Sequence, residues 1–227
     1  MQLSRDFKIR CSAIGQIMTE PRSKSETFSK TCLTYIHEWI KEQPEFYNRR
    51  FDFKSKYTTK GNECENESID FASKVLGWGL VSKNTEFKKN DYLTGTADII
   101  LAESVEDIKN SWSSKKFPLF ANEIPVDGYG WQLQGYCELW NKPQGGLIYT
   151  LMDAPESLIE KEAYYKAKEL GHDETPLELF EEMKAFMTYS NLKDDLRIKR
   201  FFVERDKDLI HGVNNKVDKI RDYIKSI

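Results

Sequence analysis

The order of the hydrophobic segments constrains the fold of this chain more than any other feature. Short apolar or alternating stretches, typical of strands, are separated by longer stretches in which apolar residues recur at helical spacing. This order predicts an α/β domain in which helices flank a mixed central β-sheet. The predicted strands cover residues 81–87, 92–101, 105–110, 146–151 and 196–204.

Caps and apolar spacing predict the helices between these strands. Ser12 is expected to cap a short helix that ends before Pro21. The segments 43–59 and 115–130 are predicted to be loops. The other predicted helices cover 28–42, the stretch between Gly61 and Gly77, 130–140, 155–170, 176–187 and 206–227. The last of these places one apolar stripe along its length, made of Leu209, Val213, Val217, Ile220 and Ile224.

Length and charge set broad limits on function. A chain of 227 residues can bury a substantial core and is most simply one domain, with 153–192 as a helical insertion. The net charge of −3 neither favours nor excludes DNA binding, because a nuclease need be positive only where the strand runs. No segment is apolar for long enough to span a bilayer, and the first residues do not resemble a signal peptide. We therefore expect a soluble cytoplasmic protein that does not bind membranes.

Several kinds of site are disfavoured by the residues that usually form them. The cysteines form no C-x-x-C pair, which argues against a zinc ribbon or an iron–sulfur cluster. The three histidines show no metal-ligand spacing. No serine or cysteine lies in a nucleophile motif, and no glycine-rich loop could cradle a phosphate.

The segment TGTADIILAESVEDIK, residues 94–109, contains the most informative side chains. Alternate residues of a strand share a face, so Asp107 and Lys109 should point the same way. A short turn over 102–104 would bring Asp98 beside them. Carboxylate oxygens suit a divalent cation, and a lysine can act on water or on developing charge. A lone Asp-x-Lys is usually a salt-bridged surface, but Asp98 interrupts an apolar run, where burial demands a partner.

Glu65 is a third candidate metal ligand. At about 100° per residue it shares a helical arc with Ile69, Ala72 and Leu76, whereas the neighbouring acids fall on the opposite arc. An inward, unpaired carboxylate is unfavourable, and a metal would remove that penalty. The alternative is an acid at a helix start that is favoured by the helix dipole.

Two further groups of polar residues have both a functional and an ordinary explanation. Gln132 and Tyr136 are four residues apart on one predicted helical face and can hydrogen-bond a phosphate or a water, but a half-buried helix explains them equally well. Gln134 points to a nearly opposite side, and either glutamine can be the one in the active site. Basic residues beside the Ser12 cap form either an anion site or a solvated face. They are Arg5, Lys8, Arg10, Arg22 and Lys24.

The order of these pieces along the chain resembles a known nuclease superfamily. The pieces are Gly61-x-x-x-Glu65, Asp98, Asp107-x-Lys109 and Gln132-x-x-x-Tyr136. They resemble the PD-(D/E)XK nucleases and, more narrowly, the phage lambda-type alkaline exonucleases, also called YqaJ-type viral recombinases. The match covers nearly the whole chain. It departs from the family at Ala97-Asp98, where Pro-Asp is usual, and at Asp107, where Glu is more usual.

The resemblance implies a role for each candidate residue. It makes Glu65, Asp98, Asp107 and the backbone carbonyl of Ile108 the ligands of two Mg²⁺ ions, for which Mn²⁺ can substitute. It makes Lys109 the residue that assists the attacking water. It also implies that Gln132 or Gln134 takes part in catalysis, with Tyr136 in support. The residues implied to bind the 5′-phosphate of DNA are Arg5, Ser12, Thr96 and Arg22.

The activity implied by the resemblance is 5′-to-3′ degradation of linear double-stranded DNA in phage-type recombination. It implies a ring-shaped homotrimer, a single-strand annealing protein as partner, and the cytoplasm of a bacterial host as location. One rival function is an endonuclease of repair or restriction type, which would share the catalytic residues. The other is a non-catalytic DNA-binding module on the same fold, and the retention of all three acids and Lys109 argues against it.

Overall fold

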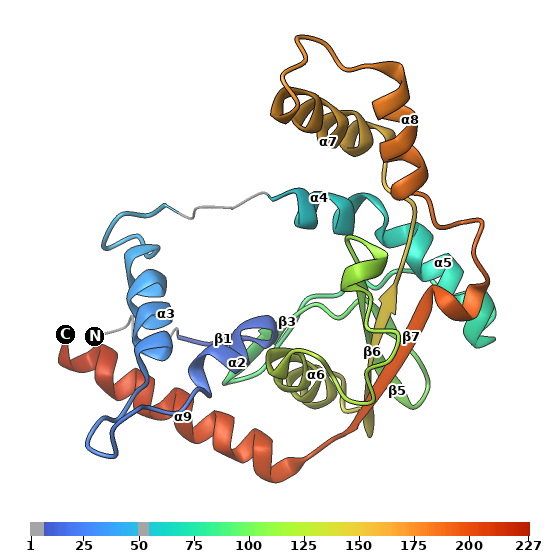
Figure 1. The fold of residues 1–227 in the computed structure, drawn as a ribbon. Helices are drawn as coiled ribbons and strands as arrows, with labels where there is room; N and C mark the ends of the chain where they lie inside the picture. The colour runs from blue at the N-terminus through green and yellow to red at the C-terminus, as the bar shows by residue number, and fades with distance from the viewer. Residues whose placement is uncertain (1–6, 50–54) are drawn as a thin grey trace.

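The computed structural model describes residues 7–49 and 55–227, and its centre is a four-stranded sheet (Figure 1). The strand order is β4 (Ile99–Ile100), β5 (Ser104–Asn110), β6 (Gln144–Thr150) and β7 (Ile198–Glu204). The two central strands, β5 and β6, are parallel, and the outer pairs are antiparallel. The predicted α/β class with a mixed sheet is therefore confirmed.

A second, smaller sheet lies beside the first and has the order β1-β3-β2. It consists of β1 (Ile9–Arg10), β3 (Leu93–Gly95) and β2 (Lys88–Lys89). The chain passes directly from β3 of this sheet to β4 of the larger one. The residues between these two strands belong to neither sheet, and Asp98 lies among them.

Helices cover both faces of the larger sheet. On one face, α6 (Asp127–Trp140) packs Leu133 against Leu147 of β6. On the other face, α5 (Glu65–Leu76) packs Ile69 against Ile108 of β5. The remaining helices are α2 (Ile14–Ile17), α3 (Lys30–Lys41), α4 (Lys56–Glu63), α7 (Glu156–Glu169), α8 (Leu177–Phe186) and α9 (Lys207–Ser226), with 3₁₀ turns at Cys11–Ala13, Ser114–Lys116 and Asp194–Leu196.

The largest hydrophobic core joins α2, α3, α6 and α9 to the smaller sheet. The stripe predicted on the last helix is buried in it from Val213 to Ile224. Leu209 is an exception, because it is 39% exposed and Ile210 is buried in its place. Positions three and four residues before Val213 are both compatible with the helical stripe, so packing against neighbouring elements decides between them.

Two helix starts differ from the predicted ones. Ser12 does not cap a helix, because it is exposed within the 3₁₀ turn Cys11–Ala13, which has no side-chain cap. The helix predicted to start after Gly61 is two helices, α4 and α5, and Gly61 lies inside α4. The start of α4 is fixed by a capping box in which Ser55 and Thr58 each accept a hydrogen bond from the backbone N–H of the other.

The predicted strand at 81–87 is wrong. Asn84 instead binds the chain around Asp98, with its backbone N–H donating to the Asp98 carbonyl over 2.7 Å and its side-chain amide donating to the Ala97 carbonyl over 2.8 Å. The Asn84 side chain also accepts a hydrogen bond from the N–H of Glu86. Local bonds of this kind compete with a strand ladder, and they hold this segment against the break between β3 and β4.

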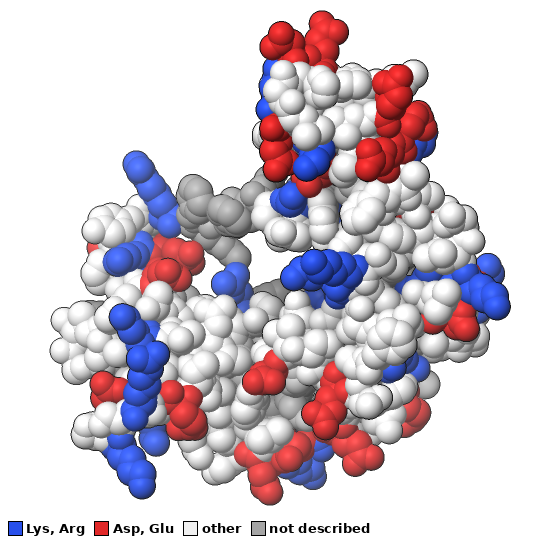
Figure 2. Space-filling view, viewed as in Figure 1, with Lys and Arg blue, Asp and Glu red and all other residues white. Residues whose placement is uncertain are grey.

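Helices α7 and α8 form an arm that projects from the rest of the fold (Figure 1). Residues 153–192 contain ten acidic and four basic side chains. Their net charge is −6, and since the whole chain carries −3, the remainder carries +3. Figure 2 shows acidic side chains gathered on the arm, whereas a group of Lys or Arg side chains lies at the edge of the central hollow.

The base of the arm contacts a buried lysine of α4. Lys60 is 1% exposed and donates to the carbonyls of Ser111 and Trp112, and its ammonium lies 5.3 Å from the ring centre of Tyr189. Burial lowers the pKa of Lys60 to about 8, although the nearby Cys64 and Asp153 oppose the change. The folded state therefore binds the Lys60 proton less tightly than the unfolded state does.

We expect Lys60 to make stability rise with pH between about 8 and 10.5. In this window the unfolded chain keeps the proton that the folded chain has lost, so the free energy of unfolding rises by up to about 1.4 kcal/mol per pH unit. Urea denaturation of the wild type and of Lys60→Met, at pH values from 7.5 to 10, measures the effect. As the pH rises, the wild type should gain stability relative to the variant. If the free energies of unfolding of the two proteins changed in parallel with pH, the assignment to Lys60 would be wrong.

Among the described residues, no helix has the length and apolar character needed to cross a membrane.

Candidate active site

Asp107 and Lys109 lie on β5, one of the two central strands, and share a face as predicted. The Lys109 ammonium is 2.6 Å from Asp107 Oδ2. Gln132 of α6 donates from Nε2 to Asp107 Oδ1 over 2.8 Å and to the Tyr136 hydroxyl over 2.9 Å. Asp107 is 2% exposed, so its charge is held by a cation and an amide rather than by bulk solvent.

Asp98 is joined to the same strand through the backbone. Its Oδ2 accepts a hydrogen bond of 2.7 Å from the N–H of Ile108, the residue between Asp107 and Lys109. This contact depends on the break between β3 and β4, because there the carboxylate can turn toward β5. The carboxylate predicted to interrupt a strand therefore lies in a bend between two strands.

The charges of these groups influence one another. Burial raises the pKa of Asp98 to about 7, and the neighbouring Asp107 carboxylate adds to the rise. Burial also raises the pKa of Asp107, although the Lys109 ammonium opposes it. Burial disfavours the charged form of Lys109, but the attraction of Asp107 outweighs it, and the pKa of Lys109 is raised. The two aspartates are thus near enough to repel, and added positive charge between them would relieve that repulsion.

Glu65 is the first residue of α5 and lies in the cleft that also contains Asp98 and Lys109. The cleft has a volume of about 410 Å³. The helical arc predicted for Glu65 is supported by Ile69 and Ala72, both buried against the sheet. The Glu65 side chain is 22% exposed and forms an ion pair of 2.5 Å with Lys83. Lys83 lies in the segment that Asn84 binds to the break between β3 and β4.

Glu65 and Asp98 of the cleft, together with Asp107 beside Lys109, carry the oxygen donors that a divalent metal prefers. Within residues 7–49 and 55–227, no three His, Cys, Asp or Glu side chains are gathered closely enough to hold a metal. Each acid instead has a local partner: the Ile108 N–H for Asp98, Gln132 and Lys109 for Asp107, and Lys83 for Glu65. Asp107 Oδ2 is buried and, despite its ion pair, accepts no well-directed hydrogen bond. A hard divalent cation fits this set of oxygen donors.

The two candidate glutamines are separated by the structure. Gln132 faces Asp107, whereas Gln134 donates to the Glu204 carbonyl over 2.7 Å and accepts from the Asp206 N–H over 2.8 Å. Gln134 thus joins α6 to the end of β7 and the start of α9. We correct the prediction that placed Gln134 among the catalytic candidates, because its amide is used on the other side of the helix.

The residues predicted to bind a 5′-phosphate come from separate segments of the chain. Arg5 lies outside the described residues. Ser12 and Thr96 are exposed. Arg22 is exposed and lines a different cavity, of about 620 Å³, at the start of α3. The phosphate anchor therefore stays a prediction.

Several residues of the cleft were missed by the sequence analysis. Tyr57, Thr58 and Asn62 of α4 form part of one wall, and Tyr129 and Tyr149 also line the cleft. The Ser55-x-x-Thr58 capping box was a signal that α4 begins before Gly61. For Tyr129 the signal was weaker: it lies three residues before Gln132, on the same helical face, if the helix starts earlier than predicted.

The fold of this chain is similar over nearly its full length to solved structures of exonucleases. A phage-related exonuclease from Haemophilus somnus 129PT is 26% identical, with a TM-score of 0.78 over 97% of this chain and 96% of the other. An alkaline exonuclease, LHK-Exo, from Laribacter hongkongensis is 14% identical, with a TM-score of 0.61 over 99% and 94%. A complex of LHK-Exo with dAMP has a TM-score of 0.63 at 13% identity, over 96% of this chain and 88% of the other.

No family model and no curated protein matches the sequence. The structural likeness confirms the fold class and the resemblance predicted from the sequence, and it supports a nuclease function for this chain.

Proposed function

We propose that this chain, which resembles the lambda-type alkaline exonucleases of the PD-(D/E)XK superfamily, is a Mg²⁺-dependent exonuclease that degrades linear double-stranded DNA from 5′ to 3′. The observation that carries the proposal is the group formed by Asp107, Lys109 and Gln132, with Asp98 attached to the same strand and Glu65 in the same cleft. The 26% identity and full-length match to a phage-related exonuclease support it.

The oxygen donors of the site would hold the metal. Asp98, Asp107, Glu65 and the backbone carbonyl of Ile108 are the proposed ligands of two Mg²⁺ ions, with Mn²⁺ as a substitute. Such ions make water nucleophilic at neutral pH and offset the charge of a phosphodiester under attack. Asp107 and Glu65 are each already paired with a lysine, Lys109 and Lys83 respectively. A metal would therefore have to bind Asp107 alongside the Lys109 ammonium, and bind Glu65 either alongside Lys83 or in its place.

The chain's own residues set the geometry of the reaction. Gln132 fixes the rotation of the Asp107 carboxylate, and Tyr136 in turn accepts a hydrogen bond from Gln132. The Ile108 N–H holds Asp98 toward β5. Lys109 has three donors. While the ammonium is paired with Asp107, its N–H groups can orient the attacking water or stabilise charge on the phosphate.

The remaining parts of the proposal concern the substrate and partners. We propose that Arg5, Ser12, Thr96 and Arg22 bind the 5′-phosphate at a duplex end. We also propose a homotrimer, a single-strand annealing protein as partner, and a phage or prophage origin in a bacterial cytoplasm. The resemblance supports these parts.

The test is digestion of linear duplexes that differ only in the 5′ end. With Mg²⁺, a 5′-phosphorylated duplex should be degraded faster than a 5′-hydroxyl duplex, because the basic anchor binds the phosphate. EDTA should abolish release of nucleotides from both. A closed circular duplex should stay intact, and its cleavage would favour an endonuclease instead. Equal rates on the two linear substrates would refute the phosphate anchor.

A further inference from the structure

We infer that Tyr129 is a positioning residue for Lys109, an assignment that rests on the proposed function. The ammonium of Lys109 lies 5.0 Å from the centre of the Tyr129 ring and 2.6 Å from Asp107 Oδ2. A cation within about 6 Å of a ring face is attracted by the ring's quadrupole. Lys109 is therefore held from two sides, by a carboxylate and by an aromatic ring.

The Tyr129 ring can restrain the Lys109 ammonium only if the ring itself is held in place. Its position on α6 holds it. Tyr129 lies in the first turn of α6, where its N–H donates to the Val126 carbonyl over 3.0 Å. This turn packs directly on α2, because a Cβ on Gly15 would come within 2.7 Å of Gly128 Cα. Glycines at the crossing thus allow the two backbones to approach closely.

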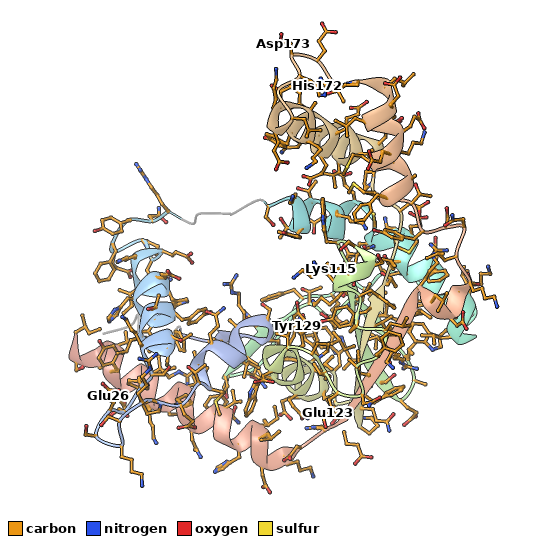
Figure 3. All side chains as sticks on the ribbon, in the orientation of Figure 1. Glu26, Lys115, Glu123, Tyr129, His172 and Asp173 are labelled. Atoms are coloured by element: carbon orange, nitrogen blue, oxygen red, sulfur yellow. The ribbon has the colours of Figure 1, made fainter. Side chains whose placement is uncertain are left out.

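Packing against other aromatic rings supports Tyr129 from the side. Its ring meets the Tyr149 ring edge-on, with centroids 6.4 Å apart, and the Tyr149 ring meets Phe201 in the same way at 6.1 Å. Both partners lie on neighbouring strands, β6 and β7, and belong to one apolar cluster with Tyr129. Figure 3 labels Tyr129 above α6, toward the segment that carries Lys115.

One helix therefore positions both members of the catalytic pair. Tyr129 and Gln132 are three residues apart and share a face of α6. Gln132 binds Asp107, and Tyr129 contacts Lys109, which are two residues apart on one face of β5. A lysine has a flexible four-carbon stem, so a contact at its ammonium reduces the range of positions that it samples. The Tyr129 ring keeps the Lys109 ammonium in the cleft beside the reacting phosphate.

The experiment compares Tyr129→Leu and Tyr129→Phe with the wild type. Leucine keeps apolar bulk but removes the ring face, so kcat should fall about 3- to 30-fold, equivalent to about 0.7–2 kcal/mol at 1.4 kcal/mol per tenfold change. KM should change less than twofold. Phenylalanine keeps the ring and should retain at least half of the wild-type kcat. Binding of the 5′-phosphorylated duplex in Ca²⁺, without turnover, should be unchanged in both.

Two controls separate this inference from other outcomes. Tyr165→Leu removes an exposed tyrosine from the α7–α8 arm and should leave kcat and KM unchanged. Lys109→Ala tests the proposed function itself, and if it left activity intact the function would fail whatever Tyr129 does. If Lys109→Ala is inactive but Tyr129→Leu keeps full kcat, the positioning role is wrong. If kcat fell as much in Tyr129→Phe as in Tyr129→Leu, the positioning role of the ring would also be wrong, because the effect would then come from the hydroxyl.

Discussion

Replacement of Lys109 by alanine is expected to reduce Mg²⁺-dependent release of nucleotides by about 100- to 10,000-fold, the range for loss of a group that moves a proton or stabilises charge in the transition state. Lys109 is the cation nearest to Asp107, with its ammonium 2.6 Å from Oδ2. Its removal takes away the proposed donor to the attacking water and the positive charge that pairs with Asp107.

Single-turnover digestion of a 5′-phosphorylated duplex measures this effect. Lys109→Arg should recover little activity, because a planar guanidinium does not reproduce the compact ammonium between Asp107 and Tyr129. Lys166→Ala is the matched control, since Lys166 is an exposed lysine of the arm paired with Glu169. Wild-type rates in Lys109→Ala would refute the hydrolytic role of the whole group, because its only lysine would then be dispensable.

The second large effect concerns stability, through Gly146→Ala. Glu106 is fully buried on the sheet face opposite Asp107, and it accepts hydrogen bonds from Ser104 and from Arg200. The Arg200 guanidinium lies over the ring of Trp78. A Cβ at position 146 would overlap the Glu106 carboxylate.

We expect Gly146→Ala to lower the free energy of unfolding by about 3–5 kcal/mol, because breaking a buried ion pair usually costs this much stability. For a chain of this length the melting temperature should fall by about 6–20 °C. Gly61→Ala is the control, because a Cβ at Gly61 of α4 meets nothing within 4 Å and alanine favours a helix. Thermal unfolding followed by circular dichroism compares the two. Equal melting temperatures would mean that the sheet accommodates the added methyl group by shifting Glu106.

Much of the site followed from periodicity that is local in the chain. Strand alternation alone placed Asp107 and Lys109 on one face. The 3.6-residue period placed Glu65 on the arc of Ile69 and Ala72, and it placed Gln132 on the face of Tyr136. These inferences needed only the type of element, because each relates residues within a few positions of one another.

Local patterns were less reliable where backbone bonding was decided by distant residues. The segment 81–87 alternates like a strand, but Asn84 binds the chain near Asp98 instead of forming a ladder. The stretch 92–101 reads as one strand, yet its two ends pair with different sheets. The gap between them is what lets Asp98 reach the Ile108 N–H.

The sequence by itself determined that Asp107 and Lys109 share a face of one strand and that Gln132 and Tyr136 share a face of one helix. From these residue types it predicted the chemistry of a metal-dependent nuclease. Only the tertiary structure decided which glutamine meets Asp107, that Lys83 is the partner of Glu65, and that Tyr129 covers Lys109. The physical reason is that side-chain direction along one helix or strand follows from a fixed period. The pairing of side chains across elements depends instead on how α6, α5 and the segment before β2 pack against β5, and contacts between residues far apart in the chain set that packing.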